Sequence, residues 1–599
     1  MPARIEDYGL VGDLQTAALI SREGSVDWLC FPRFDSGACF AALLGDEANG
    51  RWVIAPTQWK REVSRRYVPD TLILETEWRT DEGRVLVTDF MPPRGEAPDL
   101  VRIVEGLEGT VELGTELVIR FDYGSVVPWV RRVDAETLFA VAGPDALSLR
   151  TAVELRGEDF RTRGEFTVSP GERVPFVLTW FPSHRDPPAR VDPEQALADT
   201  NDYWNDWASR SEFEGDHHDA VRQSLLVLKA LTYAPTGGIV AAATTSLPEW
   251  IGGVRNWDYR FCWLRDATLT LLALLQAGYV DEASEWRGWL LRAAAGNPDD
   301  LQIMYGVAGE RRLTELELEW LQGYEHSTPV RIGNSASEQM QLDVYGELMD
   351  ALYQARAHGL EADDTAWSLQ RALLQPLEEA WREPDNGIWE FRGDRRHFTH
   401  SKVMAWVAFD RAVRSVEEHG LTGPVDRWRA LRDEIHADVC AHGFDASLGS
   451  FTQYYGSKEL DASLLLIPLV GFLPVADERV VGTVDAVERE LMHDGLVLRY
   501  RTQEDGAVDA LSKGEGVFLP CSFWLVDCWE LLGRHGDAHA LYERLLDLRN
   551  DLGLLAEEYH PVEERLLGNF PQAFTHLALV NSAFTLAHEH PPVRRRHAR

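Results

Sequence analysis

Short segments in which hydrophobic and polar positions alternate occupy the first third of the chain. Residues 71–78, 111–120 and 174–180 follow this period of two, and turn pairs such as Pro92-Pro93 separate such segments. Alternation with frequent turns is typical of antiparallel strands that bury one face. We therefore predict an antiparallel β-sandwich domain over residues 1–195.

The period changes further along the chain, where hydrophobic positions recur every three or four residues. Val221, Leu225 and Leu228 lie on one face of a predicted helix over 217–234. Further helices are predicted near 266–276, 281–296, 338–358, 364–382, 401–419, 424–442, 459–471, 479–492, 515–534, 535–550 and 571–588. Twelve helices fit a ring of six inner and six outer helices, an (α/α)6 barrel. A superhelical solenoid fits nearly as well, so periodicity leaves both open.

The domain organisation expected from these patterns has four parts. Because one hydrophobic core rarely exceeds ~250–300 residues, a chain of 599 residues requires at least two domains. We predict the β-sandwich at 1–195, a linker at 196–215, the barrel at 216–590 and a basic tail at 591–599.

Charge and composition restrict the partners. The 59 basic and 97 acidic residues give a net charge of −38, which disfavours nucleic acid and anionic membrane surfaces but not a neutral substrate. The longest apolar run, 462–476, is shorter than the ~20 residues that span a bilayer. The six cysteines lack zinc-site spacing and are expected to be reduced thiols. With no apolar leader at the N-terminus, these features predict a cytoplasmic protein without a metal or cofactor; a homo-oligomer is left open.

One segment, 255–266, combines alternating charges with aromatic rings just before a predicted helix. Aromatic platforms suit the CH faces of a sugar, and charged side chains suit its hydroxyls. The candidate contacts are Trp257, Asp258, Arg260, Trp263, Arg265 and Asp266. Structural ion pairs, Asp258–Arg260 or Arg265–Asp266 in an aromatic core, explain the pattern equally well.

Two further segments offer carboxyl groups. Glu390 follows Trp389, and a carboxyl beside an indole can have its pKa raised by desolvation, as a general acid requires. Glu557 and Glu558 precede Tyr559, which could hold a water molecule. Taken alone, each carboxylate is more simply an acidic loop residue. Two carboxyls on opposite sides of a glycosidic bond are nevertheless the minimum needed to hydrolyse it.

Long strings of the sequence, read together, resemble glycoside hydrolase family 15, the glucoamylase-like enzymes. The likeness is strongest to the bacterial branch of trehalases and related α-glucosidases. It spans nearly the whole chain and rests on 5–13, 24–35, 241–249 and 263–266.

The resemblance implies roles for individual residues. Glu390 would be the general acid and Glu557 the general base, with Glu558 and Glu338 as the alternatives for base and acid. Arg265 and Asp266 would bind hydroxyls of the non-reducing glucose, and Arg499 falls at a subsite arginine. An inverting mechanism would separate the two carboxyls by ~6.5–9.5 Å.

The resemblance also implies an exo-acting α-glucoside hydrolase, with α,α-trehalose as the expected substrate. Isomaltose or malto-oligosaccharides are the alternative substrates. A disaccharide phosphorylase would need no carboxylate base, so Glu557 argues against it. A non-catalytic sugar-binding protein would be expected to lack one of the two carboxyls, and both positions are filled.

Overall fold

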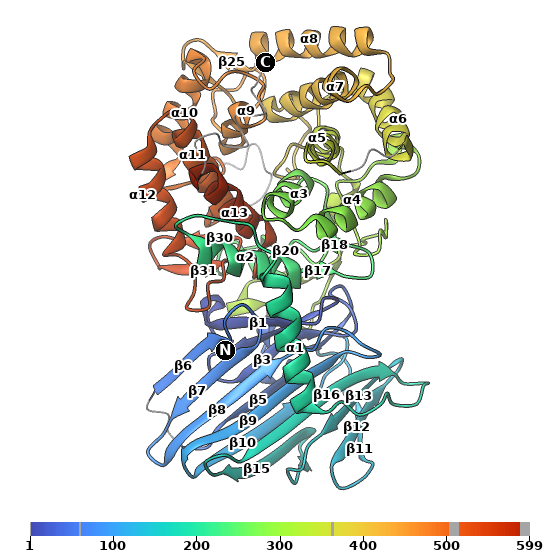
Figure 1. Ribbon diagram of the computed structural model, residues 1–599, viewed down its shortest axis with the longest axis vertical. Coiled ribbons are helices and arrows are strands. Elements are labelled where there is room, and N and C mark those ends of the chain that lie inside the picture. The colour runs from blue at the N-terminus through green and yellow to red at the C-terminus, as the bar shows by residue number, and fades with distance from the viewer. Residues whose placement is uncertain (1, 59–61, 361–363, 502–513, 588–599) are drawn as a thin grey trace.

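The computed structural model describes residues 2–58, 62–360, 364–501 and 514–587, which form a β-sheet domain followed by a helical domain (Figure 1). The expected basic tail, 591–599, lies outside the described residues. Within the described parts of the chain, no helix combines the length and apolar character needed to cross a bilayer.

Two eight-stranded antiparallel sheets make up the N-terminal domain, as predicted. One sheet has the order β1-β2-β3-β5-β10-β15-β14, with β4 also paired to β3, and the other has the order β11-β12-β13-β16-β9-β8-β7-β6. The strands of the first sheet are β1 (Tyr8–Gly12), β2 (Ala17–Ser21), β3 (Ser25–Cys30), β4 (Ala38–Phe40), β5 (Arg51–Pro56), β10 (Val111–Val118), β14 (Arg156–Glu158) and β15 (Arg161–Val168). Those of the second are β6 (Glu62–Tyr67), β7 (Leu74–Arg79), β8 (Gly83–Phe90), β9 (Asp99–Gly109), β11 (Trp129–Arg132), β12 (Thr137–Ala142), β13 (Asp145–Arg150) and β16 (Arg173–Pro182).

Burial along the strands shows where the two domains meet. β5 alternates between buried and partly buried positions, as a strand with one solvated face does. β1, β2 and β3 are buried at every position. They lie at the edge of the β domain nearest the helices (Figure 1), and the indole Nε1 of Trp28 donates to the carbonyl of Ala243 at 2.8 Å.

Most of the segment predicted as a linker, 196–215, is instead helical: α1 spans Pro193–Ala208. Asp192 caps its N-terminus by accepting from the backbone N–H groups of Glu194 and Gln195, and Pro193 suits the first turn. Its buried Trp207 stacks on Tyr279 with ring centroids 4.1 Å apart. Frequent Asp and Asn residues obscured its helical period.

Twelve α-helices follow in the described chain, and they alternate between an outer and an inner layer. The outer helices are α2 (His218–Ala230), α4 (Val280–Ala294), α6 (Asp364–Ala380), α8 (Val425–His442), α10 (Glu478–Leu491) and α12 (His535–Leu546). The inner helices are α3 (Ala267–Gln276), α5 (Asp343–Ala357), α7 (Thr399–His419), α9 (Leu466–Leu469), α11 (Leu519–Leu531) and α13 (Ala573–Ala587). Each inner helix contacts the next, and α13 contacts α3. The ring therefore closes, which excludes the solenoid and confirms the (α/α)6 barrel.

Two predicted helices differ from those observed. The helix expected over 338–358 starts only at Asp343, because Ser335–Glu338 form a separate 3-10 turn. The helix expected over 459–471 is reduced to a 3-10 turn, Ala462–Leu465, and the four-residue α9. Gly471, with φ of 80°, follows it in a left-handed conformation that does not continue a helix.

The lengths of the connections determine where a site can form. Inner helices are entered through long segments such as 231–266, 295–342, 381–398 and 547–572, whereas the return connections 277–279 and 532–534 are short. Because successive helices run in opposite directions, all the long segments gather at one end of the barrel. That end carries the candidate site.

Candidate active site

A pocket opens among the long loops, at the end of the barrel where the inner helices begin. Four arginines, four aromatic residues, two glutamates and one glutamine line it. They are Glu249, Arg255, Trp257, Tyr259, Arg265, Trp389, Glu390, Arg392, Arg499, Phe518 and Gln572. None of these described lining residues comes from the β domain. Aromatic faces between charged groups are the surroundings expected for a bound sugar.

Glu390 lies in the turn that leads to α7. The indole Nε1 of Trp263 donates to its Oε1 at 2.7 Å, and Nη1 of Arg265 donates to the same oxygen at 3.3 Å. Among the described residues both recorded donors reach Oε1, so Oε2 is the oxygen available to the pocket. The φ of Glu390 is +58°, an uncommon conformation for a non-glycine residue that is often found at functional sites.

Arg265 and Asp266 lie side by side at the start of α3. Nε of Arg265 donates to Oδ1 of Asp266 at 3.1 Å, and its Nη1 donates to the carbonyl of Ile388 at 3.0 Å. Burial raises the pKa of Asp266, although the neighbouring Arg265 partly offsets this. The pair is an ion pair, as the structural interpretation expected, and Arg265 also lines the pocket, so contact with a substrate stays a prediction.

Trp389, Trp257 and Arg499 form other parts of the wall. Nε1 of Trp389 donates to the carboxylate of Asp461 at 2.9 and 3.0 Å, so its indole supports the fold and does not bond to Glu390. The Arg392 guanidinium lies 4.5 Å from the centre of the Trp257 ring. The Arg499 guanidinium lies 5.6 Å from the Trp389 ring, in range of a cation–π interaction.

Glu557 is almost fully buried behind the lining, beside Tyr259 and Glu249. Burial raises the pKa of Glu557 above its usual range, and the negative charge of Glu249 raises it further. Arg499 and hydrogen bonds from Tyr259 and the backbone N–H of Asn569 oppose this increase. Tyr259, which hydrogen-bonds to Glu557, lines the pocket, whereas Glu557 itself is not among the lining residues.

Arg499 forms ion pairs with three acidic residues near Glu557. Nη2 of Arg499 lies 2.9 Å from Glu249, 2.8 Å from Glu515 and 3.1 Å from Glu558. One oxygen from each of Glu249, Glu557 and Glu558 lies within 4.8 Å of the others, a spacing that could also hold a metal ion. Arg499 already supplies positive charge to two of these three carboxylates.

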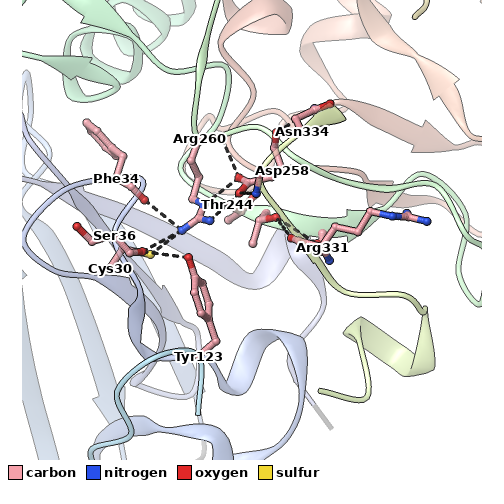
Figure 2. Close-up of polar contacts among 12 residues, drawn as sticks. Cys30, Phe34, Ser36, Tyr123, Thr244, Asp258, Arg260, Arg331 and Asn334 are labelled. Atoms are coloured by element: carbon pink, nitrogen blue, oxygen red, sulfur yellow. Dashed lines mark hydrogen bonds and ion pairs between the residues drawn. The ribbon is translucent and has the colours of Figure 1, made fainter. Parts of the chain in front are cut away.

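The structure separates Asp258 and Arg260 from the pocket. Arg260 donates to both carboxylate oxygens of Asp258, at 2.8 and 2.6 Å, and to the carbonyl of Ser36 at 3.0 Å. Figure 2 shows its guanidinium directed towards Cys30, Phe34 and Ser36 of the β domain. We therefore remove Asp258 and Arg260 from the predicted substrate contacts: they form the structural ion pair that was the alternative interpretation.

Tyr559 also lies outside the pocket lining. It belongs to β30 (Glu558–His560), which pairs with β29 (Val517–Phe518) and β31 (Arg565–Leu567). Side chains alternate along a strand, and Glu558 points towards Arg499 and accepts from the backbone N–H of Gly516 at 2.7 Å. Tyr559 consequently points away, so we no longer expect it to hold a water in the pocket.

The two alternative carboxyls are in different surroundings. Glu558 is completely buried, and its pKa is raised by burial and by Glu249. Glu338 is exposed at the end of its 3-10 turn and does not line the pocket. This location makes Glu338 a poor candidate for the acid.

Sequence reasoning missed Glu249, Glu515 and Gln572. Glu249 follows an apolar Leu-Pro pair and Glu515 stands between two glycines, and neither context signals a site. Gln572 is 2% exposed, lines the pocket, and its Oε1 has no hydrogen-bond partner in the described chain. An amide oxygen in that state is a ready acceptor for a sugar hydroxyl.

Comparison with known proteins agrees with these features. A model described as glycosyl hydrolases family 15 matches residues 215–584, and one described as trehalase-like, N-terminal matches residues 1–204. A protein named trehalase from Mycobacterium tuberculosis is 41% identical and covers 96% of this chain and 89% of its own length. Another from Thermoplasma acidophilum is 36% identical over 94% of this chain and 97% of its own.

The fold comparison gives the same result. A crystal structure of a bacterial glucoamylase complexed with acarbose aligns with a TM-score of 0.72 at 12% identity, covering 100% of this chain and 97% of that one. At that identity the likeness concerns the fold alone. The family model covers more than half of the chain, and the relatives match almost all of it: the chain belongs to glycosyl hydrolases family 15.

Proposed function

We propose that this glycoside hydrolase cleaves α,α-trehalose to two glucose molecules by a single displacement with inversion. Glu390 is the general acid and Glu557 the general base. The observation that carries the proposal is the pocket itself, in which Trp263 and Arg265 hold one oxygen of Glu390 and leave the other available. The relatives named trehalase support the choice of substrate.

The chemistry requires one proton to be given and one to be taken. Protonated Glu390 donates to the glycosidic oxygen as the bond to the anomeric carbon breaks. A water molecule attacks that carbon from the opposite face, and ionised Glu557 accepts its proton. The net reaction consumes one water molecule. In such a pair the two carboxyl groups are expected to stand ~6.5–9.5 Å apart, which leaves room for that water.

Substrate contacts follow from the lining. Arg265 and Gln572 offer a donor and an acceptor to hydroxyls, Asp266 supports Arg265, and Trp257 and Trp389 supply apolar faces. Arg499 lies at the wall beside the carboxylate cluster. These groups would orient the glucosyl ring so that binding energy is used in the transition state.

The test is to incubate the purified protein with trehalose, maltose or isomaltose, with and without phosphate, and to follow anomeric protons by NMR. Inversion at one carbon of trehalose releases β-glucose, while the leaving glucose keeps its α configuration, so the first products are equal amounts of both anomers. Two α-glucose molecules would contradict inversion, and glucose 1-phosphate would indicate a phosphorylase. Faster cleavage of maltose or isomaltose would replace trehalose as the substrate.

We also propose a cytoplasmic location. All six cysteines are free thiols, and five of them are buried, which is typical of proteins in reducing compartments. Fractionation of the native host, with detection of this chain, tests the location.

A further inference from the structure

The acidic cluster behind the pocket contains more negative than positive groups. Glu249, Glu515, Glu557 and Glu558 surround Arg499, with Arg255 at 3.8 Å from Glu249 and 3.5 Å from Glu515. Four carboxylates against two guanidiniums leave an excess of two negative charges if all were ionised. Buried like charges at this spacing do not all ionise together, so the cluster holds protons.

Glu249 has a position in this cluster that no other residue shares. It lines the pocket, its Oε2 accepts from Nη2 of Arg499 at 2.9 Å, and one of its oxygens lies within 4.8 Å of Glu557. Backbone bonds fix it on both sides, because its N–H donates to the carbonyl of Arg255 at 3.1 Å and its carbonyl accepts from Gly516 at 2.8 Å. Glu249 thus joins the loop before α3 to the loop before α11.

We propose that Glu249 is a positioning residue for the hydrolysis: it fixes Arg499 at the pocket wall, and its charge governs how readily Glu557 releases the proton it must lose to act as a base. This inference rests on the proposed roles of Glu557 and of the pocket. The groups that face Glu557 are Glu249, Glu558, Arg499, Tyr259 and the N–H of Asn569. Among them Glu249 is the one carboxylate that also lines the pocket.

Glu515 provides a matched control. It makes the same type of contact with Arg499, at 2.8 Å, and is similarly buried. It is absent from the group of three carboxylates that lie within 4.8 Å of one another. Replacing Glu515 therefore removes an equal charge and an Arg499 contact, but Glu515, unlike Glu249, is not among the leading charges that shift the pKa of Glu557.

The experiment compares Glu249→Gln with Glu515→Gln in the full chain, measuring kcat and KM for trehalose against pH. Removing the negative charge of Glu249 makes ionised Glu557 less unfavourable, so the acid limb of kcat/KM in Glu249→Gln moves to lower pH by about one unit or more. Both variants should raise KM several-fold because both loosen Arg499. Glu515→Gln should leave the acid limb within a few tenths of a unit of the wild type.

The proposal is overturned if Glu249→Gln leaves the acid limb in place, or if Glu515→Gln moves it as far. A third variant, Glu249→Asp, keeps the charge but shortens the reach to Arg499. It should raise KM without moving the acid limb, and it remains informative if the glutamine variant does not fold. Movement of the limb in Glu249→Asp would also contradict the proposal.

A second readout is independent of the substrate. The infrared carbonyl band of a protonated carboxyl that is missing in Glu557→Gln belongs to Glu557, and its loss with rising pH titrates that group. In Glu249→Gln this band should disappear at lower pH than in the wild type. If the wild type does not cleave trehalose, the proposed function fails, whereas an unchanged infrared titration contradicts the role of Glu249 itself.

Discussion

At the scale of single residues, the hydrogen bonds to Glu390 distinguish its two carboxylate oxygens. The indole N–H of Trp263 and the guanidinium of Arg265 both donate to Oε1. The backbone of Glu390 is in the left-handed conformation, and its side chain lines the pocket. A carboxyl held in this way needs little reorganisation to donate a proton, which is where positioned acids gain most of their effect.

We predict that Glu390→Gln lowers kcat by about 10²–10⁴-fold, because an amide of the same shape cannot donate the proton. Glu338→Gln is the matched control, since Glu338 is an exposed glutamate on a loop at the same end of the barrel. It should leave kcat unchanged. Steady-state rates with trehalose, with circular dichroism to verify folding, check both; equal losses in the two variants would reject the assignment of the acid.

Removing the indole donor to Glu390 should have a smaller effect. Trp263→Phe keeps an aromatic side chain, though a smaller one, and removes the hydrogen bond of 2.7 Å to Oε1, so Arg265 would be left to orient the carboxyl. We expect kcat to fall by up to about 10-fold with little change in KM, since a hydrogen bond to the uncharged, protonated acid contributes about 0.5–1.5 kcal/mol. A change confined to KM would mean that Trp263 contacts substrate instead.

Substitutions of the two adjacent glutamates, Glu557 and Glu558, should have different effects in the same assay. Glu557→Gln removes the proposed base and should lower kcat by about 10²–10⁴-fold, within the range for a general base. Glu558→Gln loses an ion pair with Arg499 of 3.1 Å and should act mainly on KM. The reverse pattern would mean that Glu558, and not Glu557, is the general base.

At the scale of elements, the strand β20 (Asn256–Asp258) and the residues after it divide their side chains between two tasks. Trp257 and Tyr259 face the pocket, while Asp258 and Arg260 face the β domain (Figure 2). The alternation of an extended chain produces this division. Sequence reasoning found the segment but could not determine which of its two faces lined a pocket, because a period of two has no inherent direction.

Arg260→Gln tests whether this joint supports catalysis. Leaving Asp258 buried without its partner should cost about 3–5 kcal/mol of stability, and the released loop should lower kcat/KM at temperatures where the variant stays folded. Glu310→Gln is the control, because Glu310 pairs with Arg33 at 2.7 Å across the same two domains but nearer the solvent. It should alter neither value by much; equal losses of kcat/KM in both variants would mean that general loosening of the domains is responsible.

Other parts of the site were beyond sequence reasoning for a different reason. Trp389-Glu390 is a local signal and could be read directly. Glu249 accepts a hydrogen bond from Arg499, which lies 250 positions later in the chain, and no local pattern predicts such a pairing. The fold class was accessible because periods of two and of 3.6 are local properties. Closure of the ring was not accessible from the sequence, because it depends on contact between α3 and α13.

At the scale of the whole molecule, one hydrophobic cluster runs through both domains, and smaller separate clusters lie within each. A single cluster of buried residues extends from Ile5 to Phe584. Arg65, in β6, has no exposed side-chain surface and donates to Asp551 of the helical domain at 2.6 Å. The interface is therefore built like a domain interior and not like a transient contact.

We predict that calorimetry will show one unfolding transition for both domains. Arg65→Ala should lower the temperature of that single transition, because it leaves Asp551 without its buried partner, and should not split it in two. A second peak that appears in either protein would show that the domains unfold independently. Arg66→Ala, in the neighbouring and exposed position of the same strand, is the control and should have little effect.

Side chains of β20 and of the residues after it contact both the pocket and the β domain, and this has a consequence for how the activity of the enzyme can evolve. Arg260 bonds to Phe34 and Ser36 of the sandwich and to Asp258 beside Trp257 and Tyr259, so we expect substitutions that shift Phe34 or Ser36 to move this part of the pocket wall. Variants selected for altered turnover should consequently include changes far outside the cavity, in a domain that supplies none of the described pocket wall. Replacing the sandwich of one relative by that of another should then change kcat and KM as well as the melting temperature.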